Sequence, residues 1–487
     1  MAGPLIGRRP VLAGLAAAPL LMAQRAPAAS GVQAFLGICY GRAERFRAPR
    51  PVSDPPLGRF GPSSPQQGRP GLAVSEDCLF LNVWTPEGAA RSPASSRAPR
   101  ARLPVMVYFH GGAYSTGTPV SPQLDGARLA AGGDVVVVTV AHRLNVFGYL
   151  YLARLDPRFP DSGNVGQLDL ILALQWVRDN IAAYGGDPRQ VMVFGQSGGG
   201  AKIATLMGTS AARGLFHRAA TMSGQQVTAS GPLHATERAR AFMAQVRARS
   251  VDDLLAMPVE RLVEGLSATD PYLGGGVYMG PVLDMTWLLR HPFWPDANPQ
   301  GNAIPMMLGN TRDETRAFYP PDHPKVVGLT WDNLAERMAP ELRIDALPEW
   351  VVAEYRRHFP AYSAEQIFYA ATTAGRSWRG QVIEAEERAR AGVPGYVYQL
   401  NYPDPAPHAS DIPLVFGTYE SPAARPVSEA MMRAFVRFAR TGNPGWAPYT
   451  LPRRQTMIFD GAPHLESDPR KWERELFARI PYIQPGT

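Results

Sequence analysis

Cysteine is scarce in this sequence. Among its 487 residues only Cys39 and Cys78 occur, which excludes a small fold held together by several disulfides. The two thiols could pair in an oxidising compartment, and their spacing alone leaves that question open. No cluster of histidines and cysteines has the spacing of a metal site, so we expect neither a metal nor another cofactor.

Long apolar runs are also missing beyond the N-terminus, so we expect no stable membrane insertion of the mature chain. Hydrophobic residues make up 45% of the sequence and charged residues 19%. This balance is typical of a globular protein with a substantial core. The length would allow two or three average domains. Because no internal repeat and no clean linker divides the chain, we predict a single domain over residues 29–487.

No basic segment interleaved with aromatic residues is present. The formal charge is +7 at neutral pH, but Arg8, Arg9 and Arg25 contribute to it before any acid occurs in the chain. The other arginines are scattered among acids, which argues against a nucleic-acid partner.

The first 28 residues have the pattern of an export signal. Arg8 and Arg9 precede an apolar run, Pro10–Met22, that is too short to span a bilayer. Small residues suited to cleavage follow at Ala26–Ala28. Paired arginines before a modest apolar segment indicate the twin-arginine type, and hence a periplasmic or secreted protein. A disordered or membrane-tethered N-terminus is the alternative.

Strand-length apolar segments alternate with helical segments along most of the chain. This alternation predicts an α/β fold, with a mostly parallel central sheet, helices on both faces and helical segments covering the edge where ligands bind. The expected strands are 32–40, 75–86, 105–109, 135–140, 191–194, 219–222, 304–308 and 396–400. The expected helical regions are 168–184, 237–266, 331–391 and 428–440.

One short segment has the form of a nucleophile elbow. The apolar strand Val191–Phe194 stops at Gly195, Ser197 lies at the tip, and small residues from Gly198 to Ala201 open a helix. Glycine is needed in such a turn because the backbone is too tight for side chains. The pattern G-x-S-x-G is weak by itself, so the rest of the chain must supply a base, an acid and donors for an oxyanion.

Donors for an oxyanion are predicted at the loop His110–Ala113. Its two glycines directly follow an apolar strand, which lets the backbone turn N–H groups toward the strand's end. The candidate donors are the N–H groups of Gly112, Ala113 and Gly198. A plain tight turn is the alternative reading of the same residues.

The candidate base and acid follow late strands. Of nine histidines, His408 alone lies in a loop shortly after a late strand. Hydrolases whose chain order is serine, acid, histidine place their base in such a loop. The carboxylates of Asp313 and Glu314 follow the strand at 304–308 and both qualify by position. A solvated charged turn would have the same composition as the segment that holds these acids.

Several motifs in order resemble the type-B carboxylesterase family. They include Glu76–Pro86, Phe194–Gly200, Asn164–Asp169 and Gly214–Arg218, and the similarity extends from about Val32 to Asp460. The resemblance implies an α/β-hydrolase fold and a serine carboxylesterase that acts on a small-molecule ester through an acyl-enzyme. Amides, carbamates and other activated acyl compounds are alternative substrates, and a non-catalytic binding or adhesion protein is a remote alternative.

The resemblance also implies the roles of individual residues. Ser197 would be the nucleophile, His408 the general base and Glu314, rather than Asp313, the acid that orients the histidine. The donor N–H groups named above would form the oxyanion hole.

Departures from the family pattern are informative. Gln196 stands where the family usually has glutamate, which leaves the site less negative and favours uncharged esters over choline esters. Gly198 replaces a common alanine, and Ala113 replaces the third glycine of the oxyanion loop. Cys39 stands where the family usually has proline, and the first hairpin is missing. The usual partner of Cys78 is also absent, which puts the family's first disulfide in doubt.

Overall fold

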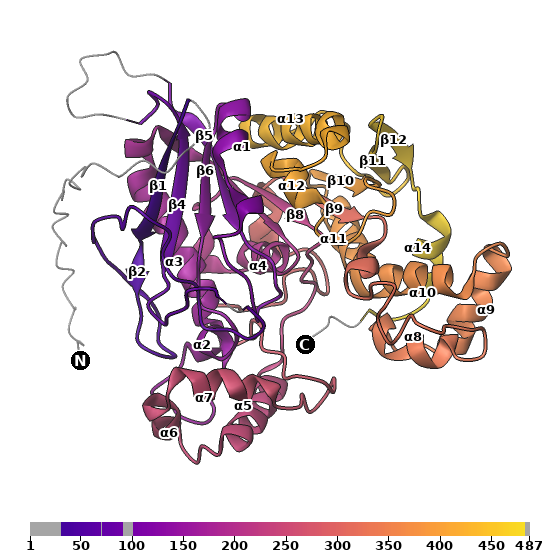
Figure 1. The fold of residues 1–487 in the computed structure, drawn as a ribbon, viewed down its shortest axis with the longest axis horizontal. Helices are drawn as coiled ribbons and strands as arrows, with labels where there is room; N and C mark the ends of the chain where they lie inside the picture. The colour runs from indigo at the N-terminus through magenta and orange to yellow at the C-terminus, as the bar shows by residue number, and fades with distance from the viewer. Residues whose placement is uncertain (1–30, 70, 91–100, 483–487) are drawn as a thin grey trace, which may run out of the picture.

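The computed structural model describes residues 31–69, 71–90 and 101–482. Within them, ten strands form one sheet through the middle of the molecule (Figure 1). In spatial order they are β1 (Val32–Cys39), β4 (Phe80–Pro86), β6 (Val136–Val140), β5 (Leu103–Phe109), β7 (Gly186–Gln196), β8 (Arg218–Met222), β9 (Met306–Thr311), β10 (Gly395–Leu400), β11 (Gln455–Phe459) and β12 (His464–Ser467). A separate pair joins β2 (Gly41–Arg42) to β3 (Arg50–Pro51).

The centre of the large sheet is parallel. Every neighbouring pair from β6 to β11 runs parallel, and the antiparallel pairs lie toward the two edges, at β1, β4 and β12. Parallel strands require both faces of the sheet to be covered. All seven residues of β5 are accordingly buried. The predicted mostly parallel sheet is confirmed.

Helices cover both faces of this sheet and create two cores. Alternate residues of β5 belong to different cores, because successive side chains of a strand point to opposite faces. Val105 and Val107 pack on the side of α3 (Val165–Asn180) and α4 (Gly198–Met207). Tyr108 packs on the other side. That second side is covered by α1 (Ala127–Gly133), α12 (Asp411–Phe416) and α13 (Arg425–Thr441).

Two groups of helices lie beyond the sheet, each with its own apolar cluster. Below the sheet in Figure 1 lie α5 (Pro232–Val246), α6 (Val251–Ala256) and α7 (Val259–Glu264), near the short α2 (Asn145–Tyr149). On the right lie α8 (Leu334–Leu342), α9 (Pro348–His358), α10 (Ala364–Thr372) and α14 (Lys471–Ala478), with a π-helical stretch, Thr373–Trp378, leading from α10 into α11 (Arg379–Arg390).

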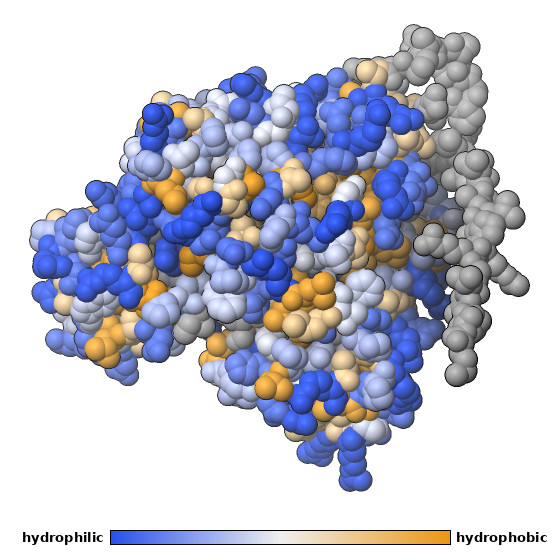
Figure 2. All heavy atoms as spheres, turned by 180° about the vertical axis from the view of Figure 1, so that it is seen from behind, coloured by the Kyte–Doolittle hydropathy of each residue, from blue (hydrophilic) through white to orange (hydrophobic). Residues whose placement is uncertain are grey.

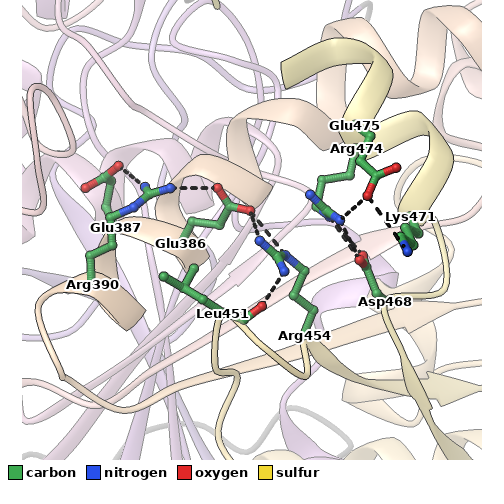
Figure 3. Close-up of polar contacts among 9 residues, drawn as sticks. All are labelled: Glu386, Glu387, Arg390, Leu451, Arg454, Asp468, Lys471, Arg474 and Glu475. Atoms are coloured by element: carbon green, nitrogen blue, oxygen red, sulfur yellow. Dashed lines mark hydrogen bonds and ion pairs between the residues drawn. The ribbon is translucent and has the colours of Figure 1, made fainter. Parts of the chain in front are cut away.

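Two groups of ion pairs lie where the C-terminal segment approaches α11 (Figure 3). Glu386 lies 3.2 Å from both Arg390 and Arg454. Arg474 of α14 lies 2.7 Å from Asp468. Glu386, Arg474 and Asp468 are partly buried, so solvent and salt screen their charges less than those of an exposed pair. The Glu386–Arg454 pair therefore joins the segment around Arg454 to α11, and the Arg474–Asp468 pair joins α14 to the residue that follows β12.

Element boundaries differ from the sequence prediction where the chain is polar. Strand β7 begins at Gly186 rather than 191, because Gly186 already pairs with Leu103 of β5. Strand β4 begins at Phe80 rather than 75. Strands β11 and β12 were not predicted. The proposed export signal, residues 1–28, lies outside the described residues.

Both cysteines are free and buried in the structure. The thiol of Cys39 donates to the Gly41 carbonyl at 3.3 Å. Burial raises the pKa of the Cys78 thiol above its ordinary value, so this sulfur is held in its neutral form. The possible Cys39–Cys78 disulfide is therefore absent here.

The surface seen from behind is mostly hydrophilic, with apolar side chains scattered over it (Figure 2). Isolated exposed apolar residues are ordinary on protein surfaces. Among the described residues, no helix combines the length and apolar character that a membrane crossing requires.

Candidate active site

Ser197 lies at the junction of β7 and α4 in a strained backbone conformation. Its φ is 54° and its ψ is −124°, a region that residues other than glycine rarely adopt. The Ser197 N–H donates to the Met222 carbonyl of the neighbouring strand β8 at 2.7 Å. Such strain persists only where the surroundings enforce it, and it is concentrated at functional sites.

The surrounding glycines are required by close packing. A Cβ atom on Gly199 would lie 1.9 Å from the Phe109 carbonyl oxygen. One on Gly198 would lie 2.1 Å from the Ala113 carbonyl oxygen. Atoms cannot approach so closely, so the start of α4 can lie against β5 and its following loop only if these positions lack side chains.

The loop His110–Ala113 lies directly against the elbow. It leaves β5 at Phe109, whose Cα is paired with Gly195 of β7. A Cβ atom on Gly111 would lie 3.3 Å from the Ser197 Cβ. Gly112 and Ala113 both have positive φ, 89° and 54°, so the chain reverses here. The predicted oxyanion loop and the predicted nucleophile are thus neighbours.

Glu314 and His408 are in direct contact. Glu314 follows β9 and His408 follows β10, and these strands are adjacent in the sheet. The His408 Nδ1 atom contacts the Glu314 Oε2 atom. Because a carboxylate accepts, Nδ1 carries the proton and Nε2 is left with a lone pair. The carboxylate of Glu314 is fully buried, whereas the His408 side chain is 11% exposed.

Three donors fix the other oxygen of Glu314. Its Oε1 accepts from the Ser223 hydroxyl at 2.6 Å, the Thr311 N–H at 2.8 Å and the Asn310 amide at 3.1 Å. Burial opposes the charged form of Glu314, but His408 and these donors outweigh burial and lower its pKa. The carboxylate therefore stays charged and oriented toward His408.

Asp313, the other candidate acid, has different partners. Its Oδ2 accepts from the Ala406 N–H at 2.9 Å and from Arg312 Nε at 3.0 Å. The Asp313 N–H in turn donates to the Ala406 carbonyl. Asp313 thus pins the loop that carries His408, while Glu314 contacts the imidazole.

Gln196 lies between the elbow and the imidazole. Its side chain is buried, and its Nε2 lies 3.0 Å from His408 Nε2. Since Nδ1 of His408 carries the proton, the Gln196 amide donates to the Nε2 lone pair. This contact brings the imidazole to the end of β7 that carries Ser197.

Another buried acid lies close to this pair. Asp411, the first residue of α12, accepts from the Tyr398 hydroxyl at 3.0 Å. Burial and the nearby charge of Glu314 raise the pKa of Asp411 to about 7. Neither this acid nor Ser223 was predicted as part of the site. The sequence signal that could have identified Ser223 is its position: it is a small polar residue, followed by Gly224, directly after the buried strand β8.

The match to known proteins decides the family. The model of the carboxylesterase family matches residues 22–472. This chain belongs to the carboxylesterase family. Among the described residues, no group of three or more His, Cys, Asp or Glu side chains is arranged to hold a metal ion.

Relatives and solved structures agree with this assignment. The chain is 33% identical over 427 residues to the para-nitrobenzyl esterase of Bacillus subtilis, and the matched region covers 82% of each protein. It is 32% identical over 474 residues to a probable N-octanoylanthranilate hydrolase of Rhodococcus erythropolis, covering 88% of this chain and 94% of that protein. The carboxylesterase EST55 of Geobacillus stearothermophilus superposes with a TM-score of 0.80 and 32% identity, over 92% of this chain and 96% of that one. The chain is a serine carboxylesterase with the α/β-hydrolase fold.

Proposed function

We propose that Ser197, His408 and Glu314 form the catalytic triad of this carboxylesterase. The observation that carries the proposal is the contact between Glu314 and His408 beside the elbow. An acid, a base and a serine in this arrangement activate a hydroxyl for attack on an acyl carbon.

Proton movement follows from the tautomer of His408. Glu314 holds the proton on Nδ1, so Nε2 accepts the proton of Ser197 as its oxygen bonds to the carbonyl carbon. The buried carboxylate then stabilises the imidazolium, which returns the proton to the departing alcohol. The Gln196 amide donates to the same lone pair in the resting site. The Gln196 amide must therefore move away from His408 Nε2 before this nitrogen can accept the proton of Ser197.

The oxyanion is assigned to backbone donors. We propose the N–H groups of Gly112, Ala113 and Gly198, because the loop and the start of α4 adjoin Ser197. Backbone donors held in place before the reaction stabilise the developing negative charge without reorganisation. Water then attacks the acyl-enzyme, with His408 acting again as base, and releases the acid.

Uncharged esters are the proposed substrate class. Gln196 adds no negative charge beside His408. The Phe318 ring lies 4.9 Å from the His408 ring. The Arg376 guanidinium beside Phe318 is paired with Glu341 at 3.2 Å, so its charge is balanced locally. Because glutamine is neutral, the site lacks the carboxylate that would attract a cationic choline group beside the nucleophile. N-acyl compounds are the second candidate class, because a relative with 32% identity is named as a probable N-octanoylanthranilate hydrolase.

Hydrolysis of short para-nitrophenyl esters tests the proposal. We expect turnover by the wild type, and a loss of at least about a thousandfold in kcat for Ser197→Ala and His408→Ala. His464→Ala, at an exposed histidine of β12, is the matched control and should keep full activity. A folded Ser197→Ala variant with wild-type turnover would refute the triad, and a folded but inactive wild type would favour a binding protein. Neutral esters, choline esters and anilides that share one acyl group show which of these substrate classes the enzyme prefers.

We also propose that residues 1–28 direct export to the periplasm or beyond and that residues 29–487 form one domain. Arg8 and Arg9 before the apolar run Pro10–Met22 support the export signal. Cell fractionation of the full chain and of a variant with both arginines replaced by lysine tests it. Equal export of the two proteins would contradict a twin-arginine route.

A further inference from the structure

Lys202 is a buried lysine on the helix that begins at the proposed nucleophile. It lies five residues after Ser197 on α4, and its side chain is fully buried. Lysine is rarely buried completely unless its ammonium has partners. Here Nζ donates to the Ala113 carbonyl at 2.7 Å and to the His110 carbonyl at 3.3 Å. Both acceptors belong to the proposed oxyanion loop.

The surroundings of Lys202 supply acceptors for a cation. Its Nζ lies 5.2 Å from the centre of the Tyr114 ring, whose face attracts positive charge. The neighbouring rings of His110 and His142 are stacked 4.6 Å apart. Burial, together with Lys202 itself, lowers the pKa of both histidines, that of His110 to about 3, so they stay neutral. Burial lowers the pKa of Lys202 to about 7, so its ammonium predominates below neutral pH and is lost as the pH rises above it.

The two carbonyls that Lys202 holds lie on either side of the proposed donor amides. The His110 carbonyl precedes the N–H groups of Gly112 and Ala113 along the chain, and the Ala113 carbonyl follows them. Ala113 has a φ of 54°, a conformation that costs a residue other than glycine of order 1 kcal/mol. The loop therefore needs an external restraint to keep its donors in place.

We infer that Lys202 is a positioning residue of the oxyanion hole. Its ammonium ties the start and the end of the loop to α4, the helix that carries Ser197, and adds positive charge behind the donor amides. Both effects stabilise the state in which the ester carbonyl becomes an oxyanion, more than they stabilise the bound ester. The inference rests on the oxyanion donors proposed above.

Lys202→Met tests the inference, because methionine keeps most of the side-chain volume and removes the ammonium. Deleting a direct oxyanion donor costs about a hundred- to a thousandfold in kcat. Lys202 acts through the loop, so we expect a fall in kcat of about ten- to a hundredfold, with KM within about twofold. A trifluoromethyl ketone, which forms an oxyanion on the serine, should bind more weakly by the same factor as kcat/KM falls.

The matched control is Thr209→Val, two residues beyond the end of α4. Thr209 is buried, and its hydroxyl donates to the Thr205 carbonyl at 3.0 Å rather than to the loop or to Tyr114. We expect this variant to keep kcat within about threefold. A Lys202→Met effect that appears in KM alone, or that Thr209→Val reproduces, would show a merely structural lysine and overturn the inference.

Two further variants keep the experiment decisive. If Lys202→Met does not fold, Lys202→Arg and Lys202→Gln are compared at equal folded concentration. The inference requires the charged arginine variant to be faster than the glutamine variant, and equal or reversed rates overturn it. Ser197→Ala separates this inference from the triad: full turnover in that variant refutes the triad, whereas full turnover in Lys202→Met with an inactive Ser197→Ala refutes only the role of Lys202.

Discussion

Replacing Ser223 with alanine removes one hydroxyl from the group of donors that surrounds the Glu314 carboxylate. That hydroxyl donates at 2.6 Å to a fully buried acceptor. The substitution adds no atoms, so no steric clash is introduced. Ser223 has a φ of 53°, which costs alanine about as much as serine. The loss of the hydrogen bond should therefore dominate the effect.

The expected magnitude follows from the charge of the acceptor. A hydrogen bond to a charged group contributes about 1.5–3 kcal/mol to the free energy of unfolding, whereas one between neutral groups contributes about 1 kcal/mol. Ser428→Ala is the matched control, because its buried hydroxyl donates to the neutral Leu414 carbonyl at 2.7 Å. We expect Ser223→Ala to lose about twice as much stability as Ser428→Ala at neutral pH.

The pH dependence should separate the two variants. The pKa of Glu314 in the folded protein is lowered from its ordinary value of 4.5, partly by Ser223. The stability that its charge contributes is therefore present above pH 4.5 and is lost as the pH falls through the folded-state pKa. The loss of unfolding free energy caused by Ser223→Ala should therefore be constant above the folded-state pKa of Glu314 and shrink below that pKa. The deficit of Ser428→Ala should not change over the same range.

Urea denaturation followed by tryptophan fluorescence, from neutral pH to below 4.5, measures both deficits. Ester hydrolysis by Ser223→Ala should also slow, because Glu314 then orients His408 less firmly. The reasoning would be refuted if the two variants lost equal stability at every pH, or if the Ser223→Ala deficit grew on acidification.

Two further predictions concern packing and redox state. Gly199→Ala should prevent correct folding or inactivate the enzyme, because its Cβ would lie 1.9 Å from the Phe109 carbonyl oxygen. The control is Gly461→Ala, whose Cβ would meet no atom within 4 Å. This variant should change Tm by no more than about 1 °C. Equal behaviour of the two variants would contradict the packing argument. Reducing agents should leave Tm unchanged because both thiols are free. A thiol reagent should modify the buried Cys78 only after unfolding. Rapid modification of Cys78 in the native protein would contradict its burial.

The central strands and the order of the site motifs could be predicted because they leave local signals. Strand β6 is a continuous apolar run buried on both faces, and such runs differ sharply from the polar loops around them. The elbow and the loop at His110–Ala113 were visible as glycines at strand ends. Strand β12 was not predictable in this way, because all four of its residues are exposed and no alternation marks it.

Contacts between distant segments account for what the sequence could not predict. Both Asp313 and Glu314 contact the loop after β10, and the choice between them depends on which carboxylate reaches the His408 imidazole. The sequence indicated that Gln196 is neutral where glutamate is usual, but it could not predict the contact with His408, which joins residues 212 positions apart. The donation from Lys202 to Ala113 likewise joins two segments 89 positions apart. Such contacts depend on the packing of whole strands and leave no trace in a local pattern.

The order of strands in the sheet also determines when activity can first appear during synthesis. The proposed site draws on the ends of β5, β7, β9 and β10, which are close together in the sheet but emerge from the ribosome at very different times. A growing chain can form the elbow and the proposed oxyanion loop early, yet it lacks the proposed base until His408 has emerged and β10 has docked on β9. Pairing of such distant segments is slow compared with local folding. A nascent chain that ends before His408 therefore lacks the proposed base, and ester hydrolysis reports that β10 has docked on β9.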